Sequence, residues 1–143
     1  MGVIGITSDK IEFCWDEMSK LLDPAIARSR GRLTNESVKA ALIEREMQLW
    51  VSIDNDGTIE AACTTQIIQY PGVKVLGLPL IGGKNRGNWL PFEPMFIAYA
   101  KENGCTEMEG YARPGWVGLV RKISHSVLGK EWEPCWTIIR KKI

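Results

Sequence analysis

The sequence is poor in the residues that build metal sites and nucleophilic catalytic sites. It contains a single histidine, His125, and four cysteines. Cys14, Cys63, Cys105 and Cys135 are widely separated and form no C-x-x-C pair, so no familiar zinc spacing can be completed. Each cysteine lies in an apolar pattern, which favours buried free thiols in a reducing cytoplasm. We expect no metal, and the spacing supports no Ser/His/Asp, Cys/His or paired-carboxylate arrangement.

Long apolar runs and an excess of one charge are also absent. No apolar run reaches the roughly 18 residues that suggest a membrane span. The N-terminus has no basic region followed by a long apolar core, as a secretory signal would. The net charge is +1, and the basic clusters, Arg28 to Arg32 and Arg140 to Lys142, are small. We therefore expect a cytoplasmic chain with no nucleic-acid partner and no membrane partner.

What is present fits one folded domain, residues 1–143. Of the 143 residues, 45% are hydrophobic, which is ample for a single core. Apolar periodicity and turn signals predict the following order. It is a strand at 3–7, a helix from Ile11 that ends at Asp23-Pro24, a helix from Thr34 to about Arg45 or Glu46, strands at 49–53, 58–69 and 73–81, a helix at 92–103, a strand at 105–111, a helix from Arg113-Pro114 and a strand at 131–139.

Two local signals refine the middle of the chain. Asn55-Asp56-Gly57 predicts a hairpin turn between the strands on either side. The second half of the 58–69 strand does not alternate cleanly, which predicts a bulge or a change of covered face. Pro79 cannot donate to a strand ladder. We therefore expect the 73–81 strand to part from a neighbour near Leu78 to Leu80.

This order of elements resembles the GNAT acyltransferase fold over the whole chain. The resemblance implies an α+β fold with a mixed, mostly antiparallel central sheet of about six strands and helices on both faces. In that family the fourth and fifth strands splay, the pantetheine of acyl-CoA lies in the opening, and its pyrophosphate sits on the loop entering the third helix. The segment from Gly104 to Trp116 is also similar to short GNAT-like proteins of tailed bacteriophages.

The resemblance implies that acetyl-CoA would lie along the end of the 73–81 strand and the glycine-rich loop after it. The cofactor-binding residues so implied are Leu78, Leu80, Ile81, Gly82, Gly83, Lys84, Arg86 and Gly87. The loop departs from the family motif Gln/Arg-x-x-Gly-x-Gly/Ala, because no glycine follows Arg86 at the third position and Trp89 is bulky. Pro91 and Pro94 also remove two backbone donors from the helix start, which weakens an anion site built from amides. A structural glycine turn is the alternative to a pyrophosphate site.

The catalytic candidates follow from what aminolysis of a thioester needs, which is a base for the amine and an acid for the leaving thiolate. Glu60, Glu107 and Glu109 are candidate bases, and solvated strand carboxylates are the alternative. The family's Leu-Tyr-x-Lys tyrosine is matched by Val120, which has no proton to give. Tyr111 is then the substitute acid by position alone.

The sequence contains six tryptophans. Trp15, Trp50 and Trp116 fit core stripes, whereas Trp89, Trp132 and Trp136 are candidates for a cleft or an interface.

Two classes of function remain. One is a noncatalytic GNAT-like protein with an interaction role, virion-associated or host-directed if phage-encoded, in contact with a protein partner or a second copy. The other is an acyl-CoA-dependent N-acetyltransferase that acts on an unknown amine.

Overall fold

A computed structural model of the chain describes residues 2–83, 92–111, 132–133, 135 and 138–143. The chain divides into two compact units, Met1–Tyr111 and Ala112–Ile143. Within the described residues, every helix and strand belongs to the first unit. In the second unit, the described residues of the expected 131–139 strand are not in a strand. Its remaining residues lie outside the described residues, as does the helix expected from Arg113-Pro114.

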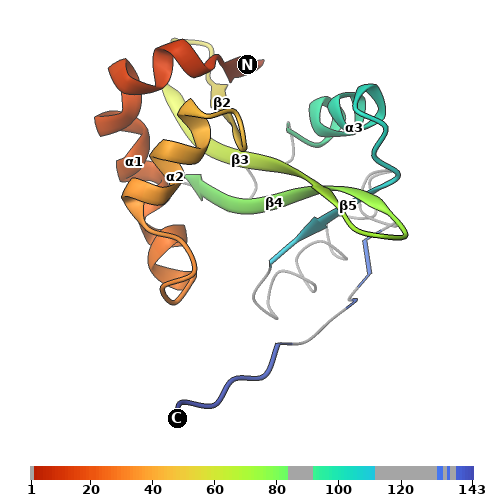
Figure 1. Cartoon of the computed structure of the whole chain (residues 1–143). Helices are drawn as coiled ribbons and strands as arrows, with labels where there is room; N and C mark the ends of the chain where they lie inside the picture. The colour runs from red at the N-terminus through yellow and green to blue at the C-terminus, as the bar shows by residue number, and fades with distance from the viewer. Residues whose placement is uncertain (1, 84–91, 112–131, 134, 136–137) are drawn as a thin grey trace. The chain divides into compact units, whose positions relative to one another are not determined.

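The first unit is built on a mixed sheet (Figure 1). Its strands are β1 (Gly2–Ile6), β2 (Gln48–Ile53), β3 (Ile59–Gln69), β4 (Lys74–Gly83) and β5 (Glu107–Gly110). They lie side by side in sequence order. The first four pair antiparallel, and β5 pairs parallel to β4. The mixed, mostly antiparallel sheet is confirmed, with five strands in the described part of the chain.

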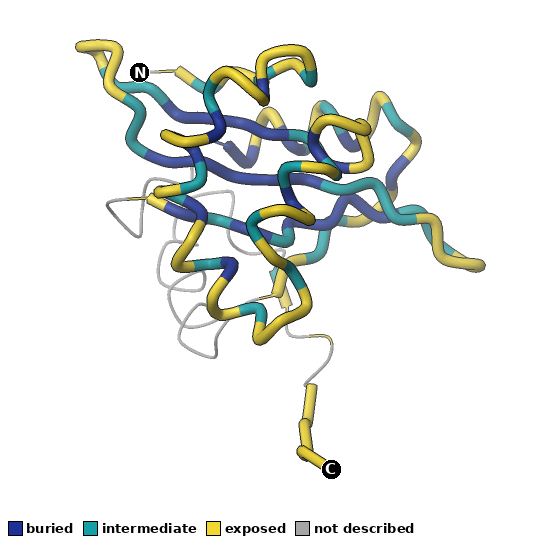
Figure 2. Tube along the Cα trace, turned by 60° about the vertical axis from the view of Figure 1, so that its left-hand side comes forward, coloured by how far each residue is buried: buried dark blue, intermediate teal, exposed yellow. Residues whose placement is uncertain are grey.

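Helices cover both faces of this sheet, as expected (Figure 1). A short 3₁₀ turn, η1 (Ser8–Lys10), leads into α1 (Ile11–Arg28), and α2 (Asn35–Ile43) follows. Both pack on the face that carries Leu49, Val51 and Leu80, and together they form the main core cluster. The third helix, α3 (Phe92–Glu102), lies on the opposite face, where Phe96 meets the Trp50 ring at 5.5 Å. Figure 2 shows the buried residues concentrated along the middle of the strands.

The expected end of the first helix at Asp23-Pro24 is wrong, because α1 continues through Pro24 to Arg28. A proline inside a helix loses one hydrogen bond and costs about 3 kcal/mol. The apolar stripe explains why the helix continues, since Leu22 and Ile26, on either side of the proline, are both buried. Pro24 itself is exposed, so its ring disturbs no packing on that face.

The turn and cap signals around the second helix and the hairpin are confirmed. Thr34 caps α2 by accepting a hydrogen bond from the Ser37 backbone N–H, and the Ser37 hydroxyl accepts one from the Thr34 N–H. The helix ends at Ile43, two residues before the expected limit of Arg45. In the hairpin, Gly57 adopts a left-handed φ of 82°, which glycine permits without strain.

Strand β4 carries a bulge where the sequence predicts a departure. Thr64 pairs with Leu80 and Gln66 with Gly77, so Leu78 and Pro79 together lie opposite Thr65. The pairing of β4 with β5 ends at Leu78 and Gly110. Pro79 is therefore the first residue of β4 beyond this pairing, where the missing backbone N–H of proline costs no hydrogen bond to β5. Beyond it, the segment Pro79–Gly83 has no β5 partner among the described residues, and we call this segment the β4 opening.

Two glycines expected in the loop after the strand lie inside β4. Gly82 pairs with Ala62 and Gly83 with Ala61, so the strand ends two residues later than expected. A Cβ atom on Gly82 would lie 2.0 Å from the carbonyl oxygen of Leu21 in α1. At Gly83 it would lie 2.8 Å from the Cβ of Ala61. Close packing therefore accounts for both glycines, and at Gly82 the neighbour is helix backbone.

Candidate functional site

The residues expected to hold acyl-CoA divide into two groups. Leu78 and Leu80 are buried, Ile81 is half-buried, and with Gly82 and Gly83 they form or border the β4 opening. The basic and glycine residues of the following loop, Lys84, Arg86 and Gly87, lie outside the described residues. The described half of the candidate site is thus an apolar strand end whose backbone faces no β5 partner.

One candidate base, Glu109, has a partner that sequence reasoning missed. The Tyr70 hydroxyl, from the turn between β3 and β4, donates to Glu109 Oε1 at 2.7 Å. This hydrogen bond to the carboxylate, followed by burial and the charge of Glu109, raises the pKa of Tyr70 above its usual value. Glu109 lies opposite Gly77, in the next-to-last pair before the β4 opening. Tyr111 follows two residues later and is 73% exposed, so a phenol and a carboxylate border this end of β5.

The other candidate carboxylates do not join this group. Ala61, the neighbour of Glu60, pairs with Gly83, six residues along β4 from the Gly77 that faces Glu109. At about 3.3 Å per residue, Glu60 is roughly 20 Å from Glu109. Glu107 lies on β5 and is exposed. Of the three carboxylates, Glu109 is the one that the fold places beside the opening.

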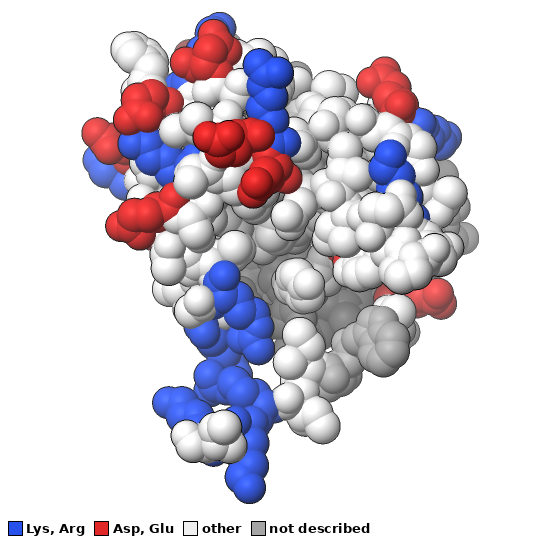
Figure 3. Space-filling view, in the orientation of Figure 1, with Lys and Arg blue, Asp and Glu red and all other residues white. Residues whose placement is uncertain are grey.

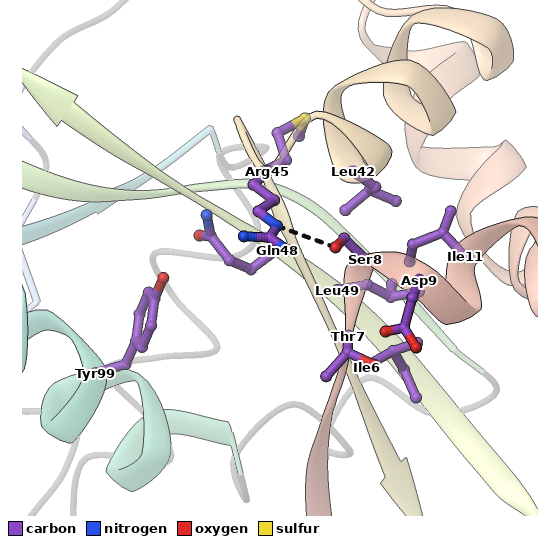
Figure 4. Close-up of a pocket in the computed structure, with 11 residues that line it drawn as sticks. Ile6, Thr7, Ser8, Asp9, Ile11, Leu42, Arg45, Gln48, Leu49 and Tyr99 are labelled. Atoms are coloured by element: carbon purple, nitrogen blue, oxygen red, sulfur yellow. Dashed lines mark hydrogen bonds between the residues drawn. The ribbon is translucent and has the colours of Figure 1, made fainter.

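A concave feature lies near the start of β2. It is a pocket of about 420 Å³ (Figure 4). Its wall comes from the stretch that runs from the end of β1 through η1 to the start of α1, from α2 and the turn after it, from the start of β2, and from α3. The lining residues are Ile6, Thr7, Ser8, Asp9, Ile11, Leu42, Arg45, Met47, Gln48, Leu49 and Tyr99. Volumes of 300 to 1,000 Å³, as a rough guide, are typical of small-molecule sites.

The polar side of this pocket is fixed by a buried hydrogen-bond chain. Trp50 Nε1 donates to Thr65 Oγ1 at 2.9 Å, and Thr65 Oγ1 donates to Gln48 Oε1 at 2.8 Å. The indole N–H can only donate, so the Thr65 hydroxyl oxygen accepts from it. The single hydroxyl proton of Thr65 is then donated to Gln48. The amide oxygen of Gln48 is thereby occupied, and its NH₂ group remains as the donor of that side chain.

Tyr99 completes the wall from α3. Its ring meets Trp50 edge-on, with centroids 5.2 Å apart. Burial, with smaller contributions from Cys105 and Glu102, raises the pKa of Tyr99, so its hydroxyl keeps its proton at neutral pH. Across the pocket, the Thr7 hydroxyl lowers the pKa of Asp9, with further lowering by Lys10 and Arg45, so this carboxylate is ionised.

Thiols, metals and membranes add no further site in the described residues. Cys63 and Cys105 are buried and Cys14 is half-buried, but Cys135 is exposed, so the expectation that every thiol is buried is wrong there. Burial raises the pKa of the Cys63 thiol, which makes it unreactive. In the described ranges, no group of three or more His, Cys, Asp or Glu residues could hold a metal ion. None of the described helices is both long and apolar enough to cross a bilayer.

The described tryptophans agree with the prediction where it concerns the core. Trp15 and Trp50 are buried, as predicted, and Trp132 is half-buried. Trp89, Trp116 and Trp136 lie outside the described residues. Acidic and basic side chains are interspersed over the upper part of the face in Figure 3. His125 also lies outside the described residues.

The strand order, the parallel β4–β5 pair with α3 between them in sequence, and the bulge at the β4 opening define the GNAT fold. Solved acetyltransferases share it. A ribosomal-protein-alanine N-acetyltransferase from Brucella melitensis biovar Abortus 2308 matches 100% of both chains, with a TM-score of 0.64 and 13% identity. Aminoglycoside N-acetyltransferase AAC(6')-Iy in complex with CoA matches 99% of this chain and 94% of its own, with a TM-score of 0.62 and 16% identity.

A third similar structure is the aminoglycoside 6'-N-acetyltransferase AAC(6')-Ih from Acinetobacter baumannii. It covers 99% of this chain and 98% of its own, with a TM-score of 0.63 and 15% identity. No protein-family model and no curated protein matches the sequence. At these identities the likeness establishes the fold, and function has to be argued from the site.

Proposed function

We propose that the chain is a GNAT superfamily member that binds acyl-CoA at the β4 opening and transfers its acyl group to an amine. The observation that supports this most is the geometry of β4. A bulge at Leu78 and Pro79 coincides with the end of pairing to β5. Beyond it the strand can offer its backbone to the amide groups of a pantetheine arm, beside the buried Leu80. The CoA-bound relative with the same fold agrees with this ligand.

The residues present fit the pantetheine part of the cofactor. Leu78, Leu80 and Ile81 would hold the arm, whereas the phosphate part depends on Lys84, Arg86 and Gly87. Gly82 and Gly83 allow the strand to pack closely, because their lack of a Cβ atom makes room for α1 and β3. The bound thioester would supply the activated acyl group.

The chain's own residues supply the proton transfers in this proposal. Glu109 takes a proton from the acceptor amine through the carboxylate oxygen that Tyr70 does not occupy. Tyr111, exposed at the same end of β5, gives a proton to the departing thiolate. The amine nitrogen forms the new bond to the acyl carbon as the carbon–sulfur bond breaks, so one proton is taken up and one is released.

The test is calorimetric titration of acetyl-CoA and CoA, with thermal unfolding as a second readout. A ligand that binds only the native state at about 100 times its Kd stabilises it by about 2.7 kcal/mol. Absence of both heat and stabilisation at millimolar CoA would refute the proposal. Where CoA binds, Glu109→Gln should keep CoA affinity and lose acyl transfer, and equal activity of this variant would remove Glu109 from the mechanism.

A noncatalytic interaction role is the second candidate, and one observation favours it. The glycines that suggested a phosphate cradle are explained by packing against α1 and β3, so Gly82 and Gly83 need no ligand to account for them. The resemblance to bacteriophage GNAT-like proteins would then place the chain in a virion or on a host target, with a protein partner or a second copy. Size in solution, measured by light scattering, and co-purification with virions test this candidate.

In either case we propose that residues 1–143 form one GNAT-like domain. The solved relatives support this, because each of those described covers at least 99% of the chain.

A further inference from the structure

The turn after α2 contains a residue that the local backbone does not favour. Glu46 N–H bonds to the Ala41 carbonyl at 2.9 Å, and Arg45 N–H bonds to the Leu42 carbonyl at 3.3 Å. These two bonds are those of a Schellman motif, in which the residue at the position of Arg45 is usually glycine. Arg45 adopts the left-handed conformation this motif requires, with φ of 64°. For a residue with a Cβ, that conformation is strained relative to glycine.

The Arg45 side chain uses this position to reach the pocket beside η1. Its Nε donates to the Ser8 hydroxyl at 3.1 Å (Figure 4). Within the described part of the chain, its terminal Nη groups make no hydrogen bond or ion pair. They form the fork that binds a carboxylate bidentately. Tethering through Nε limits the freedom of this fork without using it.

Two further donors face the same space. The NH₂ group of Gln48 is set by the chain through Thr65 to Trp50, in which Thr65 is fully buried and Trp50 is 9% exposed. The Tyr99 hydroxyl stands on the opposite wall (Figure 4). A guanidinium fork, an amide and a phenol form a donor set suited to an anion. The lining also includes apolar side chains, among them Ile6, Leu42 and Leu49, and the polar residues of the Thr7–Asp9 segment.

We propose that this pocket binds a small carboxylate on a short apolar chain, with its carboxylate on Arg45 and Gln48. Two sources share that chemistry, a free carboxylic acid and an apolar α-amino acid. Asp9 on the rim favours one of these two ligands over the other, because its ionised carboxylate repels a plain carboxylic acid and attracts the α-ammonium group of an amino acid. The site is two strands away from the β4 opening, roughly 10 Å across the sheet. It is therefore a separate site that does not overlap the β4 opening.

The experiment compares three probes of matched skeleton by calorimetry and by two-dimensional amide NMR. They are 4-methylpentanoate, L-leucine and 3-methylbutylamine at up to millimolar concentration. We expect at least one carboxylate to bind, with shifts at η1 and the start of β2, and the amine alone not to bind. Binding of neither carboxylate, or equal binding of the amine, would overturn the site.

Arg45→Gly is the decisive variant, because it separates a ligand role from a structural one. It relieves the left-handed strain, so the protein should be at least as thermally stable as the parent, while affinity for the bound carboxylate falls at least tenfold. An unchanged affinity would overturn the proposal. Arg28→Ala is the matched control, since it removes an exposed arginine that does not line the pocket, and it should bind the probes as the parent does.

Asp9→Asn distinguishes the two sources. If the natural ligand is an amino acid, this variant should weaken L-leucine and strengthen 4-methylpentanoate. If it strengthens both, the ligand is a plain acid and the carboxylate site stands. Acetyl-CoA titrated into Arg45→Gly should behave as with the parent, so a failure of acyl-CoA binding and a failure of this pocket give different results.

Discussion

Replacement of Gly82 by alanine tests how closely α1 lies against β4. The added Cβ would be 2.0 Å from the Leu21 carbonyl oxygen and 2.9 Å from the Leu21 carbonyl carbon. Both are backbone atoms of a helix whose next residue, Leu22, is fully buried in the core. Neither can swing aside as a side chain would, so strand and helix must separate along their contact.

The magnitude follows from this geometry. Overpacked core positions lose about 1–3 kcal/mol, and a clash with backbone belongs at the upper end. At an unfolding entropy of roughly 2.1 cal/mol/K per residue, a loss of about 3 kcal/mol lowers the Tm of this chain by roughly 10 °C. That loss is a large share of the free energy of unfolding of a domain, which is on the order of 5–15 kcal/mol.

The assay is urea unfolding followed by circular dichroism, without any ligand. Gly72→Ala is the control, because a Cβ there meets nothing within 4 Å, and its effect should stay within about 0.5 kcal/mol. If Gly82→Ala unfolds at the same urea concentration as the parent, the close packing of α1 on β4 is refuted. If Gly82→Ala keeps its stability but loses CoA affinity, Gly82 would instead be assigned to binding the CoA pyrophosphate.

Three further predictions use the same unfolding and titration measurements. Thr34→Ala removes the cap of α2 and should cost about 1 kcal/mol in urea unfolding, with an unchanged m-value. Pro24→Ala restores a hydrogen bond inside α1 and should raise stability, by up to about 3 kcal/mol, whereas a decrease would contradict the helix described at that position. Glu109→Gln should lower the pKa of Tyr70, seen by the ultraviolet absorbance of the phenolate. Because the pKa of Tyr70 is raised, the pair stabilises the fold below the ordinary tyrosine pKa and loses that effect as pH rises through the raised value.

The sequence predicted the features whose signals are local. Asn55-Asp56-Gly57 marked the hairpin, Thr34 marked a helix start, and Pro79 marked the place where β4 leaves β5. Each of these residues acts on its own backbone, so the structural consequence lies within a few positions of the cause.

What the sequence could not supply depends on distant neighbours. The helix through Pro24 is held by the burial of Ile26, which periodicity up to the proline does not reveal. The glycine at position 82 looked like part of a loop because its neighbour Leu21 is 61 residues earlier in the chain. Likewise, Tyr70 and Glu109 are 39 residues apart, so no spacing rule pairs them. The pocket gathers four segments, and its polar wall depends on the Trp50–Thr65 bond across two strands.

Thr65 belongs to two features at once, and this has a thermodynamic consequence. The Thr65 hydroxyl orients the Gln48 amide in the pocket. In the sheet, Thr65 is also the residue that lies opposite the two-residue bulge of Leu78 and Pro79. One side chain thus joins a wall of the pocket to the place where the sheet opens. If a ligand at the pocket shifts Thr65 and so alters affinity at the opening, linkage requires that occupancy of the opening alter affinity at the pocket by the same factor.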